Sequence, residues 1–322
     1  MFIVQLIIGA ILLALGANYL TEGASAIAKR FNLSEFLIGA TIVAVGTSMP
    51  ELVVSTMSAI QGQGDVSMGN IVGSNILNIY LILGLTALIS PMTLKGENIR
   101  RDIPIYIATA LLLCLLALDG SLFGSATNRL GRIDGLVLLV GYGLFMWLII
   151  SGEKKTTIPT SPASSQTNDG AKNRNLWLSA LMVVGGLAGL VWGADLFLDG
   201  AIVLAHKVGL SEAVISIVLV ALGTSLPELC TSVIAAIKGN TDIALGNILG
   251  SNISNILLIL GLSATINPLT LGGVNMVDMG VMFSTSIAVL LTVFCFKRAK
   301  VDRAEGAIFL LIYVAYTLYL LR

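Results

Sequence analysis

The segment Gly46–Glu51, with the sequence GTSMPE, places a carboxylate and a proline inside an apolar stretch long enough to span a membrane. A charge near the centre of a bilayer costs about 2.5 to 3.5 kcal/mol, so an acid there normally faces a polar interior and has a function. Pro50 has no N–H for the carbonyl of Gly46, which predicts a kinked helix with carbonyls near Ala44 to Thr47 freed from it.

Two hydroxyl groups share the helical face of Glu51. Thr47 and Ser48 precede the glutamate by four and three residues, the spacing that brings side chains together on a helix. The carboxylate, the hydroxyls and the freed carbonyls are all hard oxygen donors, which suit calcium and sodium better than soft metals. The segment therefore predicts a cation site.

The same hexapeptide returns as GTSLPE at Gly223–Glu228, so the chain is duplicated. A second block follows each copy, GNIVGSNILN at Gly69–Asn78 and GNILGSNISN at Gly246–Asn255. Without a gap, Leu37–Pro91 and Val214–Pro268 are identical at more than half of their positions. Both halves of this duplication carry the unusual polar residues.

Composition identifies an all-α polytopic membrane protein. The 322 residues are 56% hydrophobic and 11% charged, with a mean hydropathy of +0.94, whereas soluble domains have roughly 25% charged residues. The formal net charge is zero, so no nucleic-acid partner is expected. Apolar stretches of the length that a span requires predict ten transmembrane helices. They are Phe2–Ala28, Glu35–Ile60, Val66–Ile89, Ile103–Leu118, Ile133–Ile150, Leu176–Ala205, Ser211–Ile237, Ile243–Ile266, Val277–Phe296 and Glu305–Leu321.

Residues 151–175, rich in Ser, Thr, Pro and charge, have too little apolar surface to fold and are expected to form a flexible linker. The linker divides the chain into a first five-helix repeat, residues 1–150, and a second, residues 176–322. We also expect Asp65 and Asp242, which correspond in the two repeats, to cap the helices that follow them.

The basic residues predict the orientation. With the N-terminus outside, the outer side holds only four of the 18 lysines and arginines, which are Arg129, Arg132, Lys207 and Arg322. This bias favours both termini outside and a cytoplasmic linker. Because five spans separate equivalent positions, the two repeats are predicted to have inverted topology, the plan of many secondary transporters.

Inversion brings Glu51 and Glu228 to the same depth near the membrane midplane. Residues spaced by four in each second block then share one helical face, namely Asn70, Ser74 and Asn78, and Asn247, Ser251 and Asn255. Gly69 with Gly73, and Gly246 with Gly250, form small-xxx-small pairs that allow close helix packing.

The two hexapeptides and the two second blocks resemble the alpha repeats of the sodium/calcium exchanger family, within the cation/calcium antiporter superfamily. The resemblance implies that Glu51 and Glu228 are the central calcium-binding carboxylates and that the first and sixth spans are sliding gate helices. It also implies further ligands to sodium and calcium, which are Ala44, Thr47, Ser48, Ser74, Asn78, Ala221, Thr224, Ser225, Ser251 and Asn255. The short linker indicates a prokaryotic-type member without the calcium-sensing domains of animal exchangers.

The implied function is Na⁺/Ca²⁺ exchange by alternating access in a plasma membrane. No cofactor is expected, because Ca²⁺ and Na⁺ are bound as substrates, and no protein partner is required beside the lipid bilayer. Family members often carry an aspartate at the position of Asn78 or Asn255, and this chain has asparagine at both. Two carboxylates neutralise one Ca²⁺ or two Na⁺. Thr47-Ser48 and Thr224-Ser225 stand where proton-coupled relatives tend to have Asn-Ala, which favours sodium.

Several alternatives stay open at this point. The chain could be a proton-coupled or K⁺-dependent divalent cation antiporter, a cation channel or a non-transporting assembly factor. Nothing resembles a nucleophile with its base or a phosphate-binding loop, so an enzyme is not expected. The hydroxyls could simply bond to carbonyls of their own helices. Four asparagines could be ligands or interhelical contacts worth about 0.6 kcal/mol each; they are Asn70, Asn75, Asn247 and Asn252.

Overall fold

The computed structural model of the chain describes residues 2–96, 98–119, 128–153, 175–208, 221–294 and 299–321. Within these residues the fold is helical, apart from four two-residue strands. Six helical segments are long and apolar enough to cross a membrane, or seven if one bent pair is counted as a single span. The described helices are therefore those of a multi-pass membrane protein.

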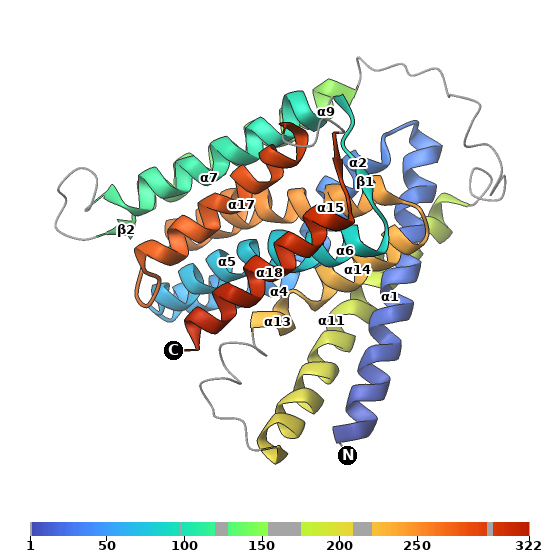
Figure 1. The fold of residues 1–322 in the computed structure, drawn as a ribbon, viewed down its shortest axis with the longest axis horizontal. Helices are drawn as coiled ribbons and strands as arrows, with labels where there is room; N and C mark the ends of the chain where they lie inside the picture. Colours follow the sequence, from blue (N-terminus) through green and yellow to red (C-terminus); the bar gives the residue numbers. More distant parts are fainter. Residues whose placement is uncertain are drawn as a thin grey trace.

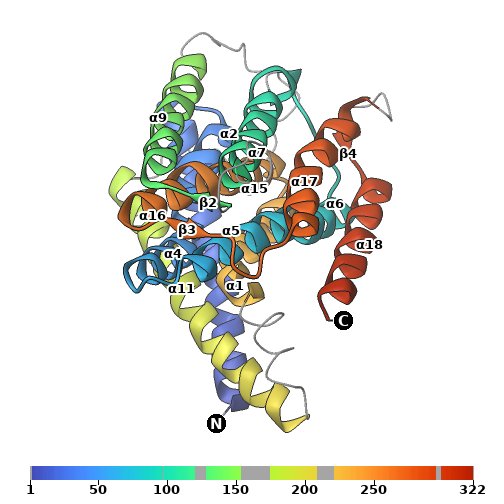
Figure 2. The same ribbon diagram turned by 90° about the vertical axis from the view of Figure 1, so that its left-hand side faces the viewer.

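Two long helices, α1 (Phe2–Phe31) and α11 (Leu176–Lys207), pack against each other and project from the remaining helices (Figures 1 and 2). A Cβ atom added to Gly16 would lie 2.8 Å from the carbonyl oxygen of Gly186, so the two backbones are in contact. The start of α1 contacts the end of α11, so the helices are antiparallel. Glycines at every seventh position form this contact, at Gly9, Gly16, Gly23, Gly186, Gly193 and Gly200.

The centre of the molecule is formed by two corresponding helical segments. Their parts are α5 (Gly64–Leu77), the π-helical turn η2 (Asn78–Leu83) and α6 (Gly84–Ile89), and α15 (Thr241–Ser254), the π-helical turn η6 (Asn255–Leu260) and α16 (Gly261–Ile266). The most apolar parts of these segments are 78% and 94% buried, against 28% for α1 and α11. Both π turns begin at an asparagine of the repeated motif, and such turns are frequent at functional sites.

The first hexapeptide lies at a break between helices. The elements are α2 (Glu35–Ile38), the π-helical turn η1 (Gly39–Val43), α3 (Ala44–Thr47) and, after the break, α4 (Met49–Ile60). The axes before and after Ser48 differ by 49°. The predicted break is therefore confirmed, but Pro50 lies in the first turn of α4, where its missing N–H leaves no helical bond unmade. The proline starts the second helix and does not kink a continuous one.

The second hexapeptide repeats this local structure. Ser225 separates α13 (Ala221–Thr224) from α14 (Leu226–Ile237), and Pro227 lies in the first turn of α14. Ser225 has φ −94° and ψ 8°, close to the φ −80° and ψ 11° of Ser48. The beginning of the expected seventh span, residues 211–220, lies outside the described residues.

The remaining helices lie above and beside this centre in the view of Figure 2. They are α7 (Ile103–Ala117), preceded by the π-helical turn η3 (Asn98–Asp102), α9 (Arg132–Glu153), α17 (Met276–Phe294) and α18 (Arg303–Leu320). Strand β1 (Met92–Thr93) pairs antiparallel with β4 (Lys300–Val301), and β2 (Arg129–Leu130) with β3 (Leu269–Thr270). Each half of the chain thus contributes one strand to each pair.

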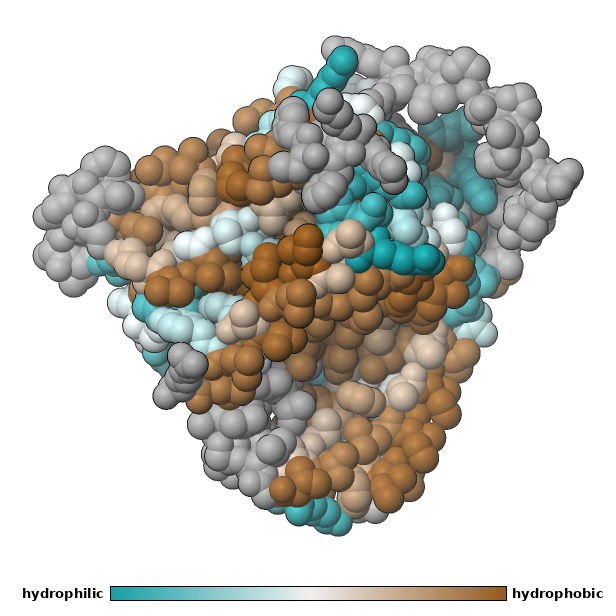
Figure 3. Space-filling view, viewed as in Figure 1, coloured by the Kyte–Doolittle hydropathy of each residue, from teal (hydrophilic) through white to brown (hydrophobic). Residues whose placement is uncertain are grey.

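Apolar side chains cover much of the surface in Figure 3, including the projecting part that α1 and α11 form in the same view. Trp177, Leu181, Val184 and Trp192 of α11 are between 65% and 83% exposed. Large apolar side chains on the surface of so hydrophobic a chain are the signature of contact with lipid.

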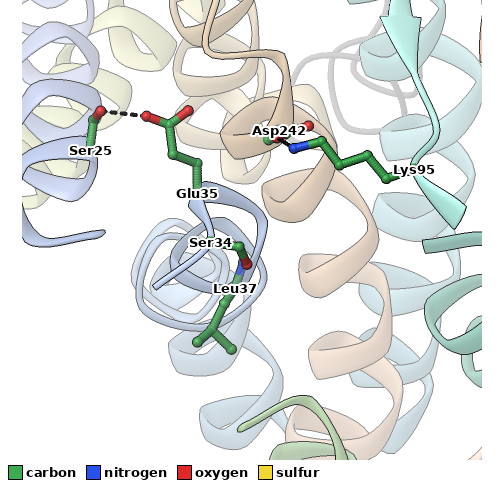
Figure 4. A network of polar contacts seen from close by, with 6 residues as sticks. All are labelled: Ser25, Ser34, Glu35, Leu37, Lys95 and Asp242. Carbon is green, nitrogen blue, oxygen red and sulfur yellow. Dashed lines mark hydrogen bonds and ion pairs between the residues drawn. The ribbon is translucent and has the colours of Figure 1, made fainter. Parts of the chain in front are cut away.

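Polar contacts hold the start of the broken span (Figure 4). Ser34 caps α2, since its Oγ accepts a hydrogen bond from the N–H of Leu37 at 3.1 Å. The Ser25 hydroxyl of α1 donates to the Glu35 carboxylate at 2.6 Å, which connects α1 to α2. Nearby, Lys95 forms an ion pair with Asp242 in the first turn of α15.

The expected spans agree with the described helices to within three residues at each described end, except that the π-helical turn η3 begins the fourth at Asn98, five residues before the expected Ile103. A total of ten membrane spans stays a prediction. One expectation is wrong, because the N-cap positions of α5 and α15 are Gln63 and Asn240. Asp65 and Asp242 lie in the first turns, where a negative charge interacts favourably with the helix dipole. Most of the expected linker, residues 154–174, lies outside the described residues.

We expect Gly186→Ala to lower the melting temperature, Tm, of the detergent-purified protein. The new Cβ would lie 2.6 Å from the Leu20 nitrogen and 2.7 Å from the Gly16 carbonyl oxygen, and overpacking of this kind costs about 1 to 3 kcal/mol. Gly185→Ala is the matched control, because a Cβ there meets nothing within 4 Å. An equal Tm for the two variants would contradict close backbone contact between α1 and α11.

Candidate cation site

The two hexapeptides converge at one buried place. Glu51 and Glu228 lie in the first turns of α4 and α14, and each is 1% exposed. The Ser48 hydroxyl donates to Glu228 Oε1 at 2.8 Å, and the Ser225 hydroxyl donates to Glu51 Oε1 at 2.9 Å. Each carboxylate is therefore held by the serine of the other hexapeptide, and the two copies build a single site.

The central helix α5 adds a hydroxyl on the Glu51 side. Ser74 Oγ donates to Glu51 Oε1 at 3.4 Å, and Ser225 Oγ lies 3.3 Å from Ser74 Oγ. All three side chains are at most 2% exposed. The carboxylate of Glu51 is thus bound by hydroxyls from both halves of the chain.

The backbone carbonyl of Ala44 is a second place where polar groups from both halves of the chain converge. It accepts hydrogen bonds from the Ser48 N–H at 3.0 Å, from Thr47 Oγ1 at 3.3 Å and from Ser251 Oγ at 3.4 Å. The sequence predicted a carbonyl freed from its helix, but in this structure the Ala44 oxygen keeps its helical bond. A cation at this carbonyl would compete with the two hydroxyls.

Four buried acceptor oxygens at the site have no hydrogen-bond partner in the described structure. They are Glu51 Oε2, Glu228 Oε2, Asn78 Oδ1 and Asn255 Oδ1. A buried acceptor without a partner costs about 1 to 3 kcal/mol, and more when it is charged. A cation bound among these oxygens would remove that cost, and two carboxylates with two amide oxygens are the donors that calcium and sodium prefer.

The two remaining predicted residues belong to α13, and the Thr224 side chain interacts with the Glu51 carboxylate. Thr224 is the last residue of α13, directly before Ser225, and Ala221 is its first. The described residues contain no cluster of three or more His, Cys, Asp or Glu that could hold a metal. The negative charge of the site therefore comes from its two glutamates.

Sequence reasoning missed a pair of serines that support the site. Asn247 donates to Ser232 Oγ at 3.0 Å, and Asn70 donates to Ser55 Oγ at 3.0 Å. Asn247 also accepts from Thr47 Oγ1 at 3.1 Å and so connects α15 to α3. A signal for these serines was present, because each follows a motif glutamate by four residues in both copies.

The family model described as "Sodium/calcium exchanger protein" matches residues 1–151 and 178–322. The chain belongs to the sodium/calcium exchanger family. It is 38% identical over 316 residues to the putative antiporter CaxA of Alkalimonas amylolytica, covering 96% of this chain and 95% of that protein. It is 34% identical over 348 residues to the sodium/calcium exchanger MaX1 of Methanosarcina acetivorans, covering 98% and 97%.

The fold of this exchanger family member also matches a solved structure of the sodium-calcium exchanger NCX_Mj soaked with Na⁺ and Sr²⁺. The TM-score is 0.82 at 32% sequence identity, covering 98% of this chain and 96% of that one. The family expected from the two motif pairs is thus confirmed, and the chain is a multi-pass membrane transporter and not an enzyme.

We expect Ca²⁺, used as a probe, to raise the Tm of the purified exchanger. A ligand that binds only the folded state stabilises it by about 2.7 kcal/mol at a concentration of 100 times Kd. Ser48→Ala and Ser225→Ala should each move the midpoint of this rise to roughly tenfold higher Ca²⁺, a loss of about 1.4 kcal/mol, because each substitution removes a hydroxyl oxygen that the proposed site offers to the cation.

Ser286→Ala is the control for these variants. Its buried hydroxyl donates to the Phe283 carbonyl of its own helix at 2.8 Å and does not contact the site. The control should keep the wild-type midpoint. A common midpoint for all four proteins would show that the serines do not serve cation binding.

Proposed function

We propose that the chain is a secondary antiporter that exchanges Na⁺ for Ca²⁺ by alternating access, with both ions using the site between Glu51 and Glu228. The observation that carries this proposal is the reciprocal bonding of each carboxylate by the other half's serine, together with four buried, unpartnered oxygens. Two carboxylates match the charge of one Ca²⁺ or two Na⁺, so the same groups could serve the two ions in turn.

In this proposal Glu51 and Glu228 are the central ligands and the ions are substrates, so the exchanger needs no resident cofactor. Hydroxyl and amide oxygens complete the coordination, which explains why polar residues recur in a membrane interior. The further ligands are Ala44, Thr47, Ser48, Ser74, Asn78, Ala221, Thr224, Ser225, Ser251 and Asn255.

We further propose ten spans in two inverted repeats, residues 1–150 and 176–322, joined by a cytoplasmic linker at residues 151–175. The antiparallel contact of α1 with α11 supports inversion. So does the strand pairing, since each pair contains one strand from each half of the chain. The excess of basic residues on the linker side supports a plasma-membrane protein with both termini outside. Inverted halves can exchange conformations, which would open one site to each side in turn.

The α1–α11 pair is the candidate for the moving part. Its two helices contact each other closely through glycines and project from the helices around the site (Figure 1). Polar contacts connect α1 to the rest, including Ser25 to Glu35 at 2.6 Å and Glu22 to Lys238 at 2.9 Å. Small residues along α1 and α11 would allow these helices to move as one unit.

The test is Ca²⁺ uptake by proteoliposomes loaded with Na⁺ and diluted into Na⁺-free choline buffer at fixed pH. Uptake should require the outward Na⁺ gradient. Glu51→Gln and Glu228→Gln should each reduce it to the level of empty liposomes, because glutamine keeps the shape but not the charge. Glu305→Gln is the matched control, since this buried glutamate belongs to a capping box in which glutamine also serves.

The same assay separates the alternative functions. Uptake that follows an imposed pH gradient would indicate a proton-coupled antiporter, and uptake that requires K⁺ in place of choline would indicate K⁺ dependence. Ca²⁺ entry without any counter-ion gradient would indicate a channel. Uptake that persists in both glutamine variants would overturn the proposed site.

A further inference from the structure

Two asparagines outside the proposed ligand set connect the halves of the exchanger behind the site. Asn75 lies in α5 and Asn252 in α15, and both are 0% exposed. Asn75 Nδ2 donates to the backbone carbonyl of Asn252 at 3.3 Å, and Asn252 Nδ2 donates to the backbone carbonyl of Asn75 at 3.2 Å. A backbone carbonyl only accepts, so these two hydrogen bonds require the amide nitrogen of each side chain to face the backbone carbonyl of the other asparagine.

The opposite ends of these amides must then be oxygens, and they face the two predicted ligand asparagines. Asn252 Oδ1 accepts from Asn78 Nδ2 at 2.9 Å, and Asn75 Oδ1 accepts from Asn255 Nδ2 at 3.0 Å. Because an amide oxygen cannot donate, Asn78 and Asn255 must turn their nitrogens toward it. Their own oxygens are thereby directed elsewhere, and these are two of the four unpartnered acceptors.

A tyrosine of α7 fixes the same orientation independently on one side. Asn252 Nδ2 also donates to the Tyr106 hydroxyl at 2.8 Å, and that hydroxyl lies 2.6 Å from Thr285 Oγ1. Thr285 donates its own proton to the Met282 carbonyl. Tyr106 therefore donates to Thr285 and keeps a lone pair for Asn252, which requires a nitrogen at that position.

We infer that Asn75 and Asn252 are positioning residues of the exchange site, which turn Asn255 and Asn78 so that they present oxygen and not nitrogen to the transported cations. The inference rests on the proposed function, since it assumes that Asn78 and Asn255 are ligands. Each positioning residue acts on the ligand from the other half of the chain. A reversed amide would point two N–H groups at a cation, so orientation decides whether these neutral side chains attract or repel the ion.

A double-mutant cycle tests this inference in the Na⁺-dependent uptake assay. Asn75→Ala should raise the apparent KM for Ca²⁺ about tenfold, the equivalent of 1.4 kcal/mol, with the maximal rate changed less than about twofold. In an Asn255→Ala background the Asn75→Ala substitution should have no further effect on KM, because its action passes through Asn255. Asn252→Ala with Asn78→Ala forms a second, independent cycle, which decides the question if Asn75→Ala does not fold.

Asn267→Ala is the matched control. Its side chain also connects the halves through an amide-to-carbonyl bond, to Ala59 at 3.2 Å, but it lies outside this set of asparagines. The control should keep the wild-type KM, since only a general loss of contact between the halves would alter it.

Two results would overturn the inference: a wild-type KM in both Asn75→Ala and Asn252→Ala, or double variants whose KM rises by the product of the single effects. Failure of the proposed function can be told apart from failure of this inference. If the wild type binds Ca²⁺ but does not exchange it for Na⁺, the same two cycles are measured as midpoints of the Ca²⁺-dependent rise in Tm. A wild type without any Ca²⁺-dependent rise would overturn both.

Discussion

The negative charge of Glu51 and Glu228 is the constraint on which the rest of the structure depends. Both carboxylates are 1% exposed, and an unpaired charge in an apolar interior is among the costliest features that a membrane protein can carry. The protein compensates each of them only in part: serine hydroxyls bind one oxygen, from Ser225 and Ser74 at Glu51 and from Ser48 at Glu228, and the other oxygen has no hydrogen bond in the described structure. At the proposed site a mobile cation would supply the missing compensation, and an antiporter that always needs some cation there would exchange ions more readily than it would move empty.

Breaks and π-helical turns in the helices position the polar groups of the site. Helix breaks at Ser48 and Ser225 turn a hydroxyl into the interior, and π-helical turns begin at Asn78 and Asn255. Close packing brings the broken segment to the centre, since a Cβ on Gly250 would lie 2.5 Å from the Ala40 Cα. Several polar groups of the site therefore lie where regular helical structure is interrupted, and glycines allow the helices that carry them to approach closely.

Local features could be predicted from the sequence, and relations between the halves could not. Duplication predicted two equivalent sets of a glutamate with two hydroxyls, and both copies do meet in one site. The helical period predicted Thr47 and Ser48 on the face of Glu51, but the helix breaks at Ser48 and its hydroxyl binds Glu228 instead. The bonding of Ser48 to Glu228 requires the relative position of two repeats, which no local pattern contains. The orientation of the asparagine amides likewise depends on backbone carbonyls of the opposite half. Other errors were avoidable: the seven-residue spacing of Gly9, Gly16 and Gly23 was visible, and a proline two residues after Ser48 is typical of the first turn of a new helix.

In the proposed exchanger both glutamates bind the same ion. Equilibrium binding of radioactive calcium to the purified, sodium-free protein tests it most directly, by counting the ions bound per chain in the wild type and in each single glutamine variant. We expect one Ca²⁺ per chain in the wild type and loss of that ion on substitution of either Glu51 or Glu228. Two bound Ca²⁺ in the wild type, with one retained in each variant, would show two separate sites and contradict it.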